Sequence, residues 1–272
     1  MIANVLTIAG SDSGGGAGIQ ADLKTFSALG TYGASVITAL TAQNTRTVTA
    51  IHDVPPDFVG AQLDAVFDDI SIDAVKIGML SRPEIIAVVA ERLQHYRADP
   101  IVVDPVMVAK SGDRLLQPEA VAALREQLLP LATVVTPNLP EAGVLLDVES
   151  PADQAGMVEV AAALRALGPQ AVLLKGGHLK GGDSTDVLDD GGDPEIFRAA
   201  RIATTNTHGT GCTLSAAIAA LLGRGLPLRT AIGQAKAYIT AAIQAADQLT
   251  VGQGHGPVHH FHALWTKETR ST

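Results

Sequence analysis

Short apolar runs alternate with longer amphipathic segments along almost the whole chain of 272 residues. This alternation is typical of strands joined by crossover helices in a mostly parallel sheet. The runs are apolar at consecutive positions, so both faces of each strand are expected to be covered. The pattern predicts strands at Val5–Ala9, Ala34–Leu40, Ala74–Ile77, Ile101–Val103, Val134–Val135 and Ala171–Leu174.

The segments between these runs have the apolar spacing of helices, with proline near several starts and glycine just after several ends. We expect an α/β protein with a single domain over residues 1–272, because neither an internal repeat nor a long polar linker interrupts the series. The predicted helices are Ile19–Leu29, Pro56–Asp69, Pro83–Tyr96, Pro118–Leu129, Leu139–Leu146, Ala152–Leu167, Cys212–Leu222 and Leu228–Leu249.

Two regions depart from this alternation. Thr185–Leu188 and Ile196–Ile202 flank Asp189–Asp193, which consists of aspartate and glycine, and this arrangement predicts an antiparallel hairpin at an edge of the sheet. The tail after Gly252 is rich in glycine and histidine and predicts irregular structure. Its four histidines are compatible with a metal site, although the edge of a lid or plain surface is the simpler interpretation.

The charge balance narrows the classes of partner. The chain has 28 acidic against 19 basic residues and a formal net charge of -9. Nucleic acids and anionic membrane surfaces attract clustered lysine and arginine, so neither is an expected partner. The single cysteine excludes an internal disulfide, and no apolar stretch approaches the ~20 residues of a membrane span. We therefore expect a cytoplasmic protein.

Loops that follow the predicted strands are the places to look for a ligand site, because parallel sheets bind ligands beyond the carboxyl ends of their strands. The first such loop, Gly10–Gly18, contains five glycines. It can bring backbone amides close to an anion at a helix start, or it is a flexible connection. It lacks the Gly-Lys-Ser/Thr of a Walker loop and the later acidic residue of a dinucleotide fingerprint.

The second loop, Asn206–Cys212, leads directly into an apolar helix. Gly209, Thr210 and Gly211 can present consecutive amides as a nest for the charge on a transferring phosphoryl group. Cys212 stands at the helix start, where the helix dipole is expected to lower the pKa of the thiol and stabilise the thiolate. Alternatively, this cysteine is a small buried hydrophobic residue.

Charged and polar residues follow three other strands. Asn138 and Glu141 stand three positions apart at a predicted helix start, where they can hold Mg²⁺ near a nucleotide, form a helix cap, or do both. Lys175 ends a strand beside glycines and is placed to meet phosphate. Asp104 also ends a strand and can serve as a metal ligand, a base or a cap. Lys236, in the last long helix, either reaches a nucleotide or extends to solvent.

This combination indicates phosphoryl transfer from a nucleotide to a small molecule. The motifs that carry it resemble, in order over nearly the whole chain, those of the hydroxymethylpyrimidine/phosphomethylpyrimidine kinase family of thiamine biosynthesis. They are Gly10–Asp22, Ala42–Thr45, Lys76–Leu80, Val103–Met107, Thr136–Glu141, Lys175–His178 and Thr207–Thr213.

The resemblance implies a ribokinase-like fold, which is a three-layer α/β/α sandwich, and a homodimer. It also implies that ATP and Mg²⁺ are used to phosphorylate 4-amino-5-hydroxymethyl-2-methylpyrimidine, first to the monophosphate and then to the diphosphate. The second step needs spare positive potential. We expect Lys175, Mg²⁺ and the glycine loops Gly14–Gly18 and Gly209–Gly211 to supply it.

The resemblance also assigns candidate roles. The pyrimidine is expected among Gly10, Ala17, Gln43, Met79 and Val106, with Gln43 bonding the aminopyrimidine edge, because a glutamine amide offers both donors and an acceptor. Many ribokinase-like enzymes carry an aspartate base after the anion loop. Cys212 occupies that place here, as in this family and a related group of pyridoxal kinases, so it is the expected base, with Asp104 as the second candidate.

Three other functions remain compatible with these residues. One is a non-catalytic ligand-binding protein, because a complete site does not by itself imply turnover. Pyridoxal kinase activity belongs to the same class, because pyridoxal is also a hydroxymethyl heteroaromatic. A nucleotide-binding oxidoreductase is possible through the first glycine loop, but it gives no role to Asn138, Glu141 or Cys212.

Overall fold

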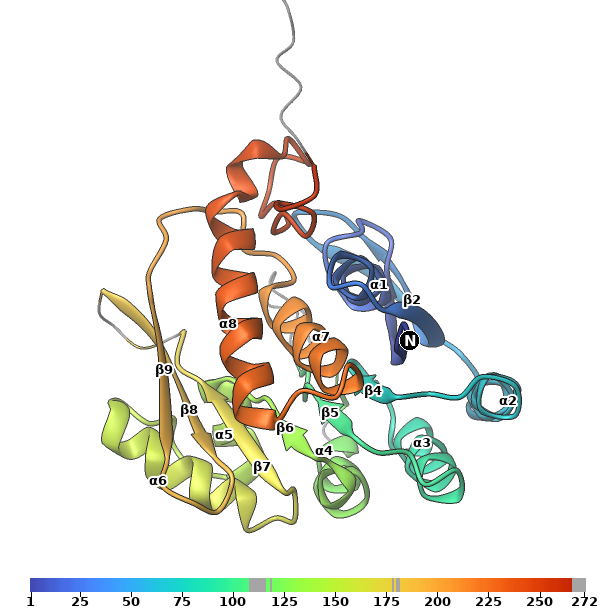
Figure 1. The fold of residues 1–272 in the computed structure, drawn as a ribbon. Helices are drawn as coiled ribbons and strands as arrows, with labels where there is room; N and C mark the ends of the chain where they lie inside the picture. The colour runs from blue at the N-terminus through green and yellow to red at the C-terminus, as the bar shows by residue number, and fades with distance from the viewer. Residues whose placement is uncertain (108–115, 118, 178, 180–181, 266–272) are drawn as a thin grey trace, which may run out of the picture.

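The structure, a computed structural model, describes residues 1–107, 116–117, 119–177, 179 and 182–265. Within these residues the centre of the molecule is a nine-stranded sheet with the strand order β3-β2-β1-β4-β5-β6-β7-β8-β9 (Figure 1). The strands are β1 (Asn4–Asp12), β2 (Tyr32–Gln43), β3 (Val48–Asp53), β4 (Ala74–Ile77), β5 (Ile101–Val103), β6 (Val134–Val135), β7 (Ala171–Lys175), β8 (Asp183–Asp189) and β9 (Glu195–Ala200).

Parallel pairing runs through the middle of the sheet, from β2 through β1, β4, β5 and β6 to β7. Antiparallel pairs flank it, with β3 on β2 at one edge and β8 and β9 at the other. The mostly parallel sheet and the hairpin of β8 and β9 are therefore confirmed. All six predicted strands are present, and β4, β5 and β6 have the predicted limits.

The sequence did not predict β3. Its six residues, Val48–Asp53, contain no apolar run to mark a buried strand, and the middle of the strand is exposed. It forms because β2 offers an unpaired edge, on which β3 pairs from Ala39 opposite Asp53 to Gln43 opposite Val48. An edge strand of this kind depends on backbone pairing more than on burial.

Helices cover both faces of the sheet (Figure 1). Helices α2 to α6 enclose one buried apolar cluster, and α1, α7 and α8 enclose a second one on the opposite face. This arrangement confirms the three-layer α/β/α sandwich. The helices are α1 (Gly18–Ala28), α2 (Pro56–Phe67), α3 (Pro83–His95), α4 (Ala120–Ala123), α5 (Leu139–Leu146), α6 (Gln154–Arg165), α7 (Thr210–Gly223) and α8 (Leu228–Gln244).

Two predicted helices are interrupted. The helix predicted over Pro118–Leu129 is a short α4 followed by a π-helical turn, Leu124–Leu128, and a 3-10 turn, Leu129–Leu131. Pro130 lacks an N–H group, so the α-helical pattern cannot continue through it. Pro118 itself lies outside the described residues. The last helix ends at Gln244 and not at Leu249, and a 3-10 turn follows it.

The described part of the tail after Gly252, which ends at Trp265, is irregular, as predicted, and it packs against the loops near the sheet's carboxyl edge. The amide of His255 donates to Thr45 O at 2.8 Å, and the amide of Gly256 donates to Asn206 Oδ1 at 3.1 Å. Among the described residues, no three His, Cys, Asp or Glu side chains are grouped as metal ligands would be. No helix in that part of the chain is long and apolar enough to cross a membrane.

Candidate active site

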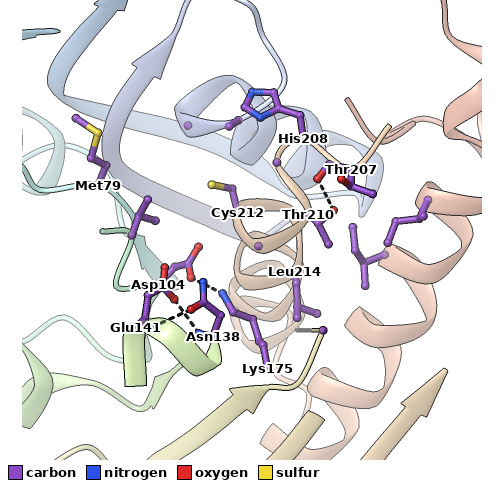
Figure 2. A pocket seen from close by; sticks show the side chains of 18 of the residues that line it. Met79, Asp104, Asn138, Glu141, Lys175, Thr207, His208, Thr210, Cys212 and Leu214 are labelled. Carbon is purple, nitrogen blue, oxygen red and sulfur yellow. Dashed lines mark hydrogen bonds and ion pairs between the residues drawn. The ribbon is translucent and has the colours of Figure 1, made fainter. Parts of the chain in front are cut away.

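One cavity of about 740 Å³ lies at the carboxyl ends of the parallel strands (Figure 2). The chain brings every predicted site residue to its wall, although they come from loops spread over more than 200 positions. They are Gly10, Ala17, Gln43, Met79, Asp104, Val106, Asn138, Glu141, Lys175, Gly209, Thr210, Gly211, Cys212 and Lys236. His178, which belongs to one of the motifs, lies outside the described residues.

One part of the cavity wall is formed by the neutral side chains of Met79, Val106 and Gln43. Met79 follows β4 and packs against Gly10, where a Cβ atom would lie 3.2 Å from the methionine Cε. Val106 is half-buried, and Gln43 at the end of β2 supplies the polar group. These side chains suit a small, flat and neutral molecule with one polar edge.

The second glycine loop has the geometry of an anion site. Gly209 caps α7 with a φ of 77°, a left-handed conformation that favours glycine. A Cβ atom there would also lie 1.8 Å from Gly16 O, so the two glycine loops touch through their backbones. The first amides of a helix have no acceptor within the helix. The amides of Gly211 and Cys212 therefore start α7 at the cavity wall, ready for an anion.

Cys212 is half-buried on the first turn of α7, and its side chain stands near the middle of Figure 2. Burial raises the pKa of its thiol to about 11, although the charge of Lys76 and the Gly18 amide oppose that shift. The expectation that the helix start lowers this pKa is wrong. Removal from water and the nearby carboxylates of Asp104 and Asp22 outweigh the dipole.

Lys175 and Asp104 form a buried ion pair at the other part of the cavity (Figure 2). Lys175 Nζ lies 2.8 Å from Asp104 Oδ1, and the side chains are 13% and 2% exposed. Burial alone would lower the pKa of Lys175, but Asp104 and then Glu141 raise it. Lys175 is therefore a fixed positive charge in the cavity wall.

Asn138 and Glu141 form a complete capping box on α5. Asn138 Oδ1 accepts from the Glu141 amide at 2.9 Å, and Glu141 Oε2 accepts from the Asn138 amide at 2.8 Å. The cap is thus confirmed, and both residues still line the cavity. Burial raises the pKa of Glu141 to about 7 against the opposing charge of Lys175, while Asp104 raises it further.

Lys236 lies inside the cavity wall and not at the surface. Its Nζ is 2.7 Å from Asp186 Oδ2 and 3.3 Å from Ser184 Oγ, and the side chain is 11% exposed. The alternative that Lys236 extends to solvent is therefore wrong. Helix α8 directs it across the cavity to the β8 hairpin.

The first glycine loop differs from both interpretations of its sequence. The amides of Gly14, Gly16 and Ala17 donate to the carboxylate of Asp12 at 2.8, 3.1 and 2.9 Å. The amide of Gly15 donates to the Asp12 carbonyl oxygen at 2.9 Å. The loop is therefore neither a flexible connection nor a free anion nest. The expectation that Gly14–Gly18 supplies spare positive potential is wrong for Gly14, Gly16 and Ala17, because an internal carboxylate already uses those amides.

Four charged or titratable residues of the site had no role assigned from the sequence. Asp12 and His208 join the two glycine loops, with 2.8 Å between Asp12 Oδ2 and His208 Nε2. Lys76 and Asp22 form a fully buried ion pair of 2.9 Å, and Lys76 lines the cavity. A lysine inside the apolar strand β4 was a visible signal for such a pair, since an unpaired buried charge is costly.

Comparisons with known proteins agree with this architecture. The family model described as phosphomethylpyrimidine kinase matches residues 12–259. The hydroxymethylpyrimidine/phosphomethylpyrimidine kinase of Rhizobium meliloti is 62% identical over 265 residues, which are 97% of this chain and 99% of the relative.

Two solved structures have the same fold over most of their length. The ADP complex of Bacillus subtilis pyridoxal kinase has a TM-score of 0.90 and 42% identity, covering 97% of this chain and 99% of that one. The phosphomethylpyrimidine kinase of Clostridium difficile has a TM-score of 0.79 and 48% identity, covering 89% and 99%. The protein therefore belongs to the phosphomethylpyrimidine kinase family and has the ribokinase-like fold expected from its motifs.

Proposed function

We propose that this kinase uses ATP to phosphorylate 4-amino-5-hydroxymethyl-2-methylpyrimidine to the monophosphate and then to the diphosphate, as a step of thiamine biosynthesis. One observation supports this proposal above the others: a single cavity joins a neutral, polar-edged part at Gln43 and Met79 to a charged part at Lys175. Cys212 and the anion loop lie on the wall between them. Such a cavity can hold an acceptor and a nucleotide together, so that transfer occurs within one complex.

The acceptor is proposed to bind with its ring between Met79 and Val106, near Gly10 and Ala17. Gln43 would hydrogen-bond the amino group and the adjacent ring nitrogen. The neutral lining favours an uncharged heteroaromatic ring over a sugar, whose many hydroxyl groups would need more polar partners.

The nucleotide is proposed to bind at the charged part of the cavity. Lys175 and the amides of Gly209–Gly211 would neutralise the transferring phosphate, which is where most of the catalytic effect of such enzymes arises. Asn138 and Lys236 would contact the rest of the nucleotide. The occupied amides of the first loop favour this placement, because they leave the second loop as the anion site.

Mg²⁺ is proposed to accompany ATP, held by Glu141 and Asp104. Their carboxylate oxygens are the hard ligands that Mg²⁺ prefers, and one or two carboxylates are sufficient when phosphates complete the shell. The carboxyl groups of Asp104 and Glu141 are also close enough to repel each other, because Asp104 raises the pKa of Glu141. A bound cation would offset this repulsion. When bound, the ion would offset the negative charge of the phosphates.

Cys212 is proposed to accept the proton of the attacking hydroxymethyl group, and Asp104 is the alternative. Because the pKa of the thiol is raised to about 11, only a small fraction is thiolate near neutral pH. The thiolate is a strong base, but few molecules carry it near neutral pH, so kcat should increase as the pH rises and the thiol ionises.

A monophosphate acceptor brings roughly -1.5 to -2 additional charges into the cavity. With the first loop occupied by Asp12, Lys175, Mg²⁺ and the second loop must offset them. We therefore expect a steeper Mg²⁺ dependence for the second phosphorylation than for the first.

The test is to measure ADP release with the aminopyrimidine, its monophosphate and pyridoxal in parallel. Phosphorus NMR then shows whether a β-phosphate signal of the diphosphate appears. Conversion of pyridoxal alone would favour the pyridoxal kinase alternative, which the Bacillus subtilis neighbour keeps open. Tight NAD(P) binding without ADP release would favour an oxidoreductase. We also propose a homodimer in the cytoplasm, which sedimentation and cell fractionation would test.

A further inference from the structure

Asp12 and His208 link the two glycine loops through side chains that stand 196 positions apart in the sequence. The imidazole fits because Gly16 has no side chain: a Cβ atom there would lie 2.3 Å from His208 Cδ2. Asp12 is 3% exposed and His208 11%, so the contact is largely shielded from water. The proposed function does not use this pair.

The hydrogen bonds of Asp12 show which ring nitrogen of His208 carries a hydrogen. Asp12 accepts from three amides and has a pKa held below its usual value, since His208 and those amides outweigh the opposing effect of burial. An ionised carboxylate can only accept. His208 Nε2, at 2.8 Å from Asp12 Oδ2, must therefore carry a hydrogen and donate it.

The amide of Gln43 lies between His208 and Thr41. Its nitrogen is 3.4 Å from His208 Nε2, and its oxygen is 3.1 Å from Thr41 Oγ1. Thr41 has one hydroxyl hydrogen and two possible acceptors, and Ser11 O at 2.8 Å is nearer than the Gln43 oxygen, so we assign the hydrogen to Ser11. Both amide contacts therefore join like groups, two donors at His208 and two acceptors at Thr41.

Rotation of the amide by 180° about its last bond exchanges oxygen and nitrogen with almost no change of shape. In that orientation the oxygen lies beside His208 Nε2 and takes the weaker share of its one hydrogen, whose main acceptor is Asp12. The nitrogen donates to Thr41 Oγ1. The contact between two donors at His208 is then removed, and the contact at Thr41 becomes a hydrogen bond. The neighbours of Gln43 thus distinguish the two ends of its amide.

We infer that His208, held by Asp12, is a positioning residue that keeps the oxygen of the Gln43 amide on its own side and thereby sets which way round the pyrimidine binds. This inference rests on the proposed function. The substrate edge has an amine beside a ring nitrogen, so the amine pairs with the amide oxygen and the ring nitrogen with the amide N–H.

The orientation of the bound ring decides where its reacting group lies, because the hydroxymethyl group is on the ring carbon next to the one that carries the amine. An amine on the His208 side places the hydroxymethyl group on that side as well. His208 directly precedes Gly209, where the anion loop and then Cys212 follow. A reversed amide would favour the reversed ring and turn the reacting group away from them.

The test compares His208→Phe, which keeps a ring but removes the donor, with His208→Gln, whose amide N–H reaches a similar position. We expect His208→Phe to raise KM for the aminopyrimidine about tenfold, because a reversed Gln43 amide loses a hydrogen bond to the ring edge, with KM for ATP changed less than about twofold. His208→Gln should stay within about threefold of the wild type. His95→Phe, on the exposed end of α3, is the matched control and should change neither constant.

A double-mutant cycle with Gln43→Ala distinguishes an effect of His208 through the Gln43 amide from a general disturbance of the site. If His208 acts through Gln43, His208→Phe should change KM by less than about twofold once Gln43 is alanine. A substrate analogue without the amino group gives a second readout. The wild type should discriminate against it strongly, and His208→Phe should lose about tenfold of that discrimination.

Additive effects in the cycle, or equal increases of both KM values, overturn the inference while the function stands. Absence of aminopyrimidine turnover in the wild type overturns the proposed function and the inference with it. If thermal melting shows that His208→Phe does not fold, His208→Asn takes its place, because its shorter amide does not reach Asp12. Retention of the wild-type KM by His208→Asn would equally contradict the inference.

Discussion

The two glycine loops of the cavity both lead into a helix but use their amides differently. In Asp12–Gly18 the amides donate to the carboxylate of Asp12, which belongs to the loop itself. In Thr207–Cys212 the amides begin a helix and have no such carboxylate. A single acidic residue at the end of β1 therefore makes the first loop a structural support, which leaves the second loop as the proposed anion site. Glycine content alone does not distinguish the two.

The largest expected effect is at the second loop. Cys212→Ala should lower kcat by about 100- to 10,000-fold, the range for general base catalysis, because the thiol acts in the transition state. KM for the aminopyrimidine should change only a few-fold. Steady-state kinetics with ADP detection measures both constants. A variant with nearly wild-type kcat would make Cys212 a packing residue and Asp104 the base.

Removal of the charge beside the second loop should have the next largest effect. Lys175→Ala should lower kcat/KM by about 100- to 1,000-fold, as expected for the loss of a preorganised group that stabilises transition-state charge. Lys175→Met keeps the aliphatic chain and controls for packing, so it should be equally impaired.

Glu141→Gln isolates the proposed metal role from the helix cap, because glutamine can still form the capping box. Added Mg²⁺ should partly restore activity to Glu141→Gln and hardly affect Lys175→Met. Titration of kcat/KM with Mg²⁺ measures this difference, and the reverse order of rescue would contradict the assignment of both residues.

The pH profile of the wild type should reveal the raised pKa of Cys212, which is about 11. If the thiolate is the base, kcat should rise by close to tenfold per pH unit between about pH 7 and 9, since the ionised fraction grows in that proportion. A base that is fully ionised throughout this range would give a flat profile. The Cys212→Ala variant provides the control for pH effects elsewhere.

A substitution in the first loop should change the free energy of unfolding more than it changes kcat. Asp12→Ala leaves three amides without their acceptor and should lower the free energy of unfolding by about 1–3 kcal/mol. Urea denaturation measures this loss. The freed amides should also bind anions, so added sulfate should raise the Tm of the variant more than that of the wild type. Equal effects of sulfate would contradict the comparison between the loops.

The same carboxylate has a defined pH dependence. The pKa of Asp12 is lower in the folded protein than its ordinary value of about 4. Its contribution to stability is therefore present above about pH 4 and is lost as the pH falls through the folded value. Asp12→Asn should show a weaker loss of stability over that acidic range, measured by urea denaturation at several pH values.

Much of the fold and of the cavity wall was predictable because those features are local. The strands Ile101–Val103 and Val134–Val135 are continuous apolar runs, as expected for strands covered on both faces, and their limits match the structure. The loops after such strands necessarily meet at one edge of a parallel sheet. Residues as distant as Gln43 and Lys175 therefore reach one cavity, and the motifs identified which of them to expect there.

Tertiary structure alone decided the electrostatic state of the site. The sequence places Cys212 at a helix start, which predicts a low pKa, but burial among Asp104 and Asp22 raises it. It likewise gives no indication that Asp12 fills the first loop or that His208 contacts it from 196 positions away. Local sequence determines helices, strands and turns, whereas desolvation and long-range pairing depend on which segments meet in space. Those two effects set the charges, pKa values and free amides on which the chemistry depends.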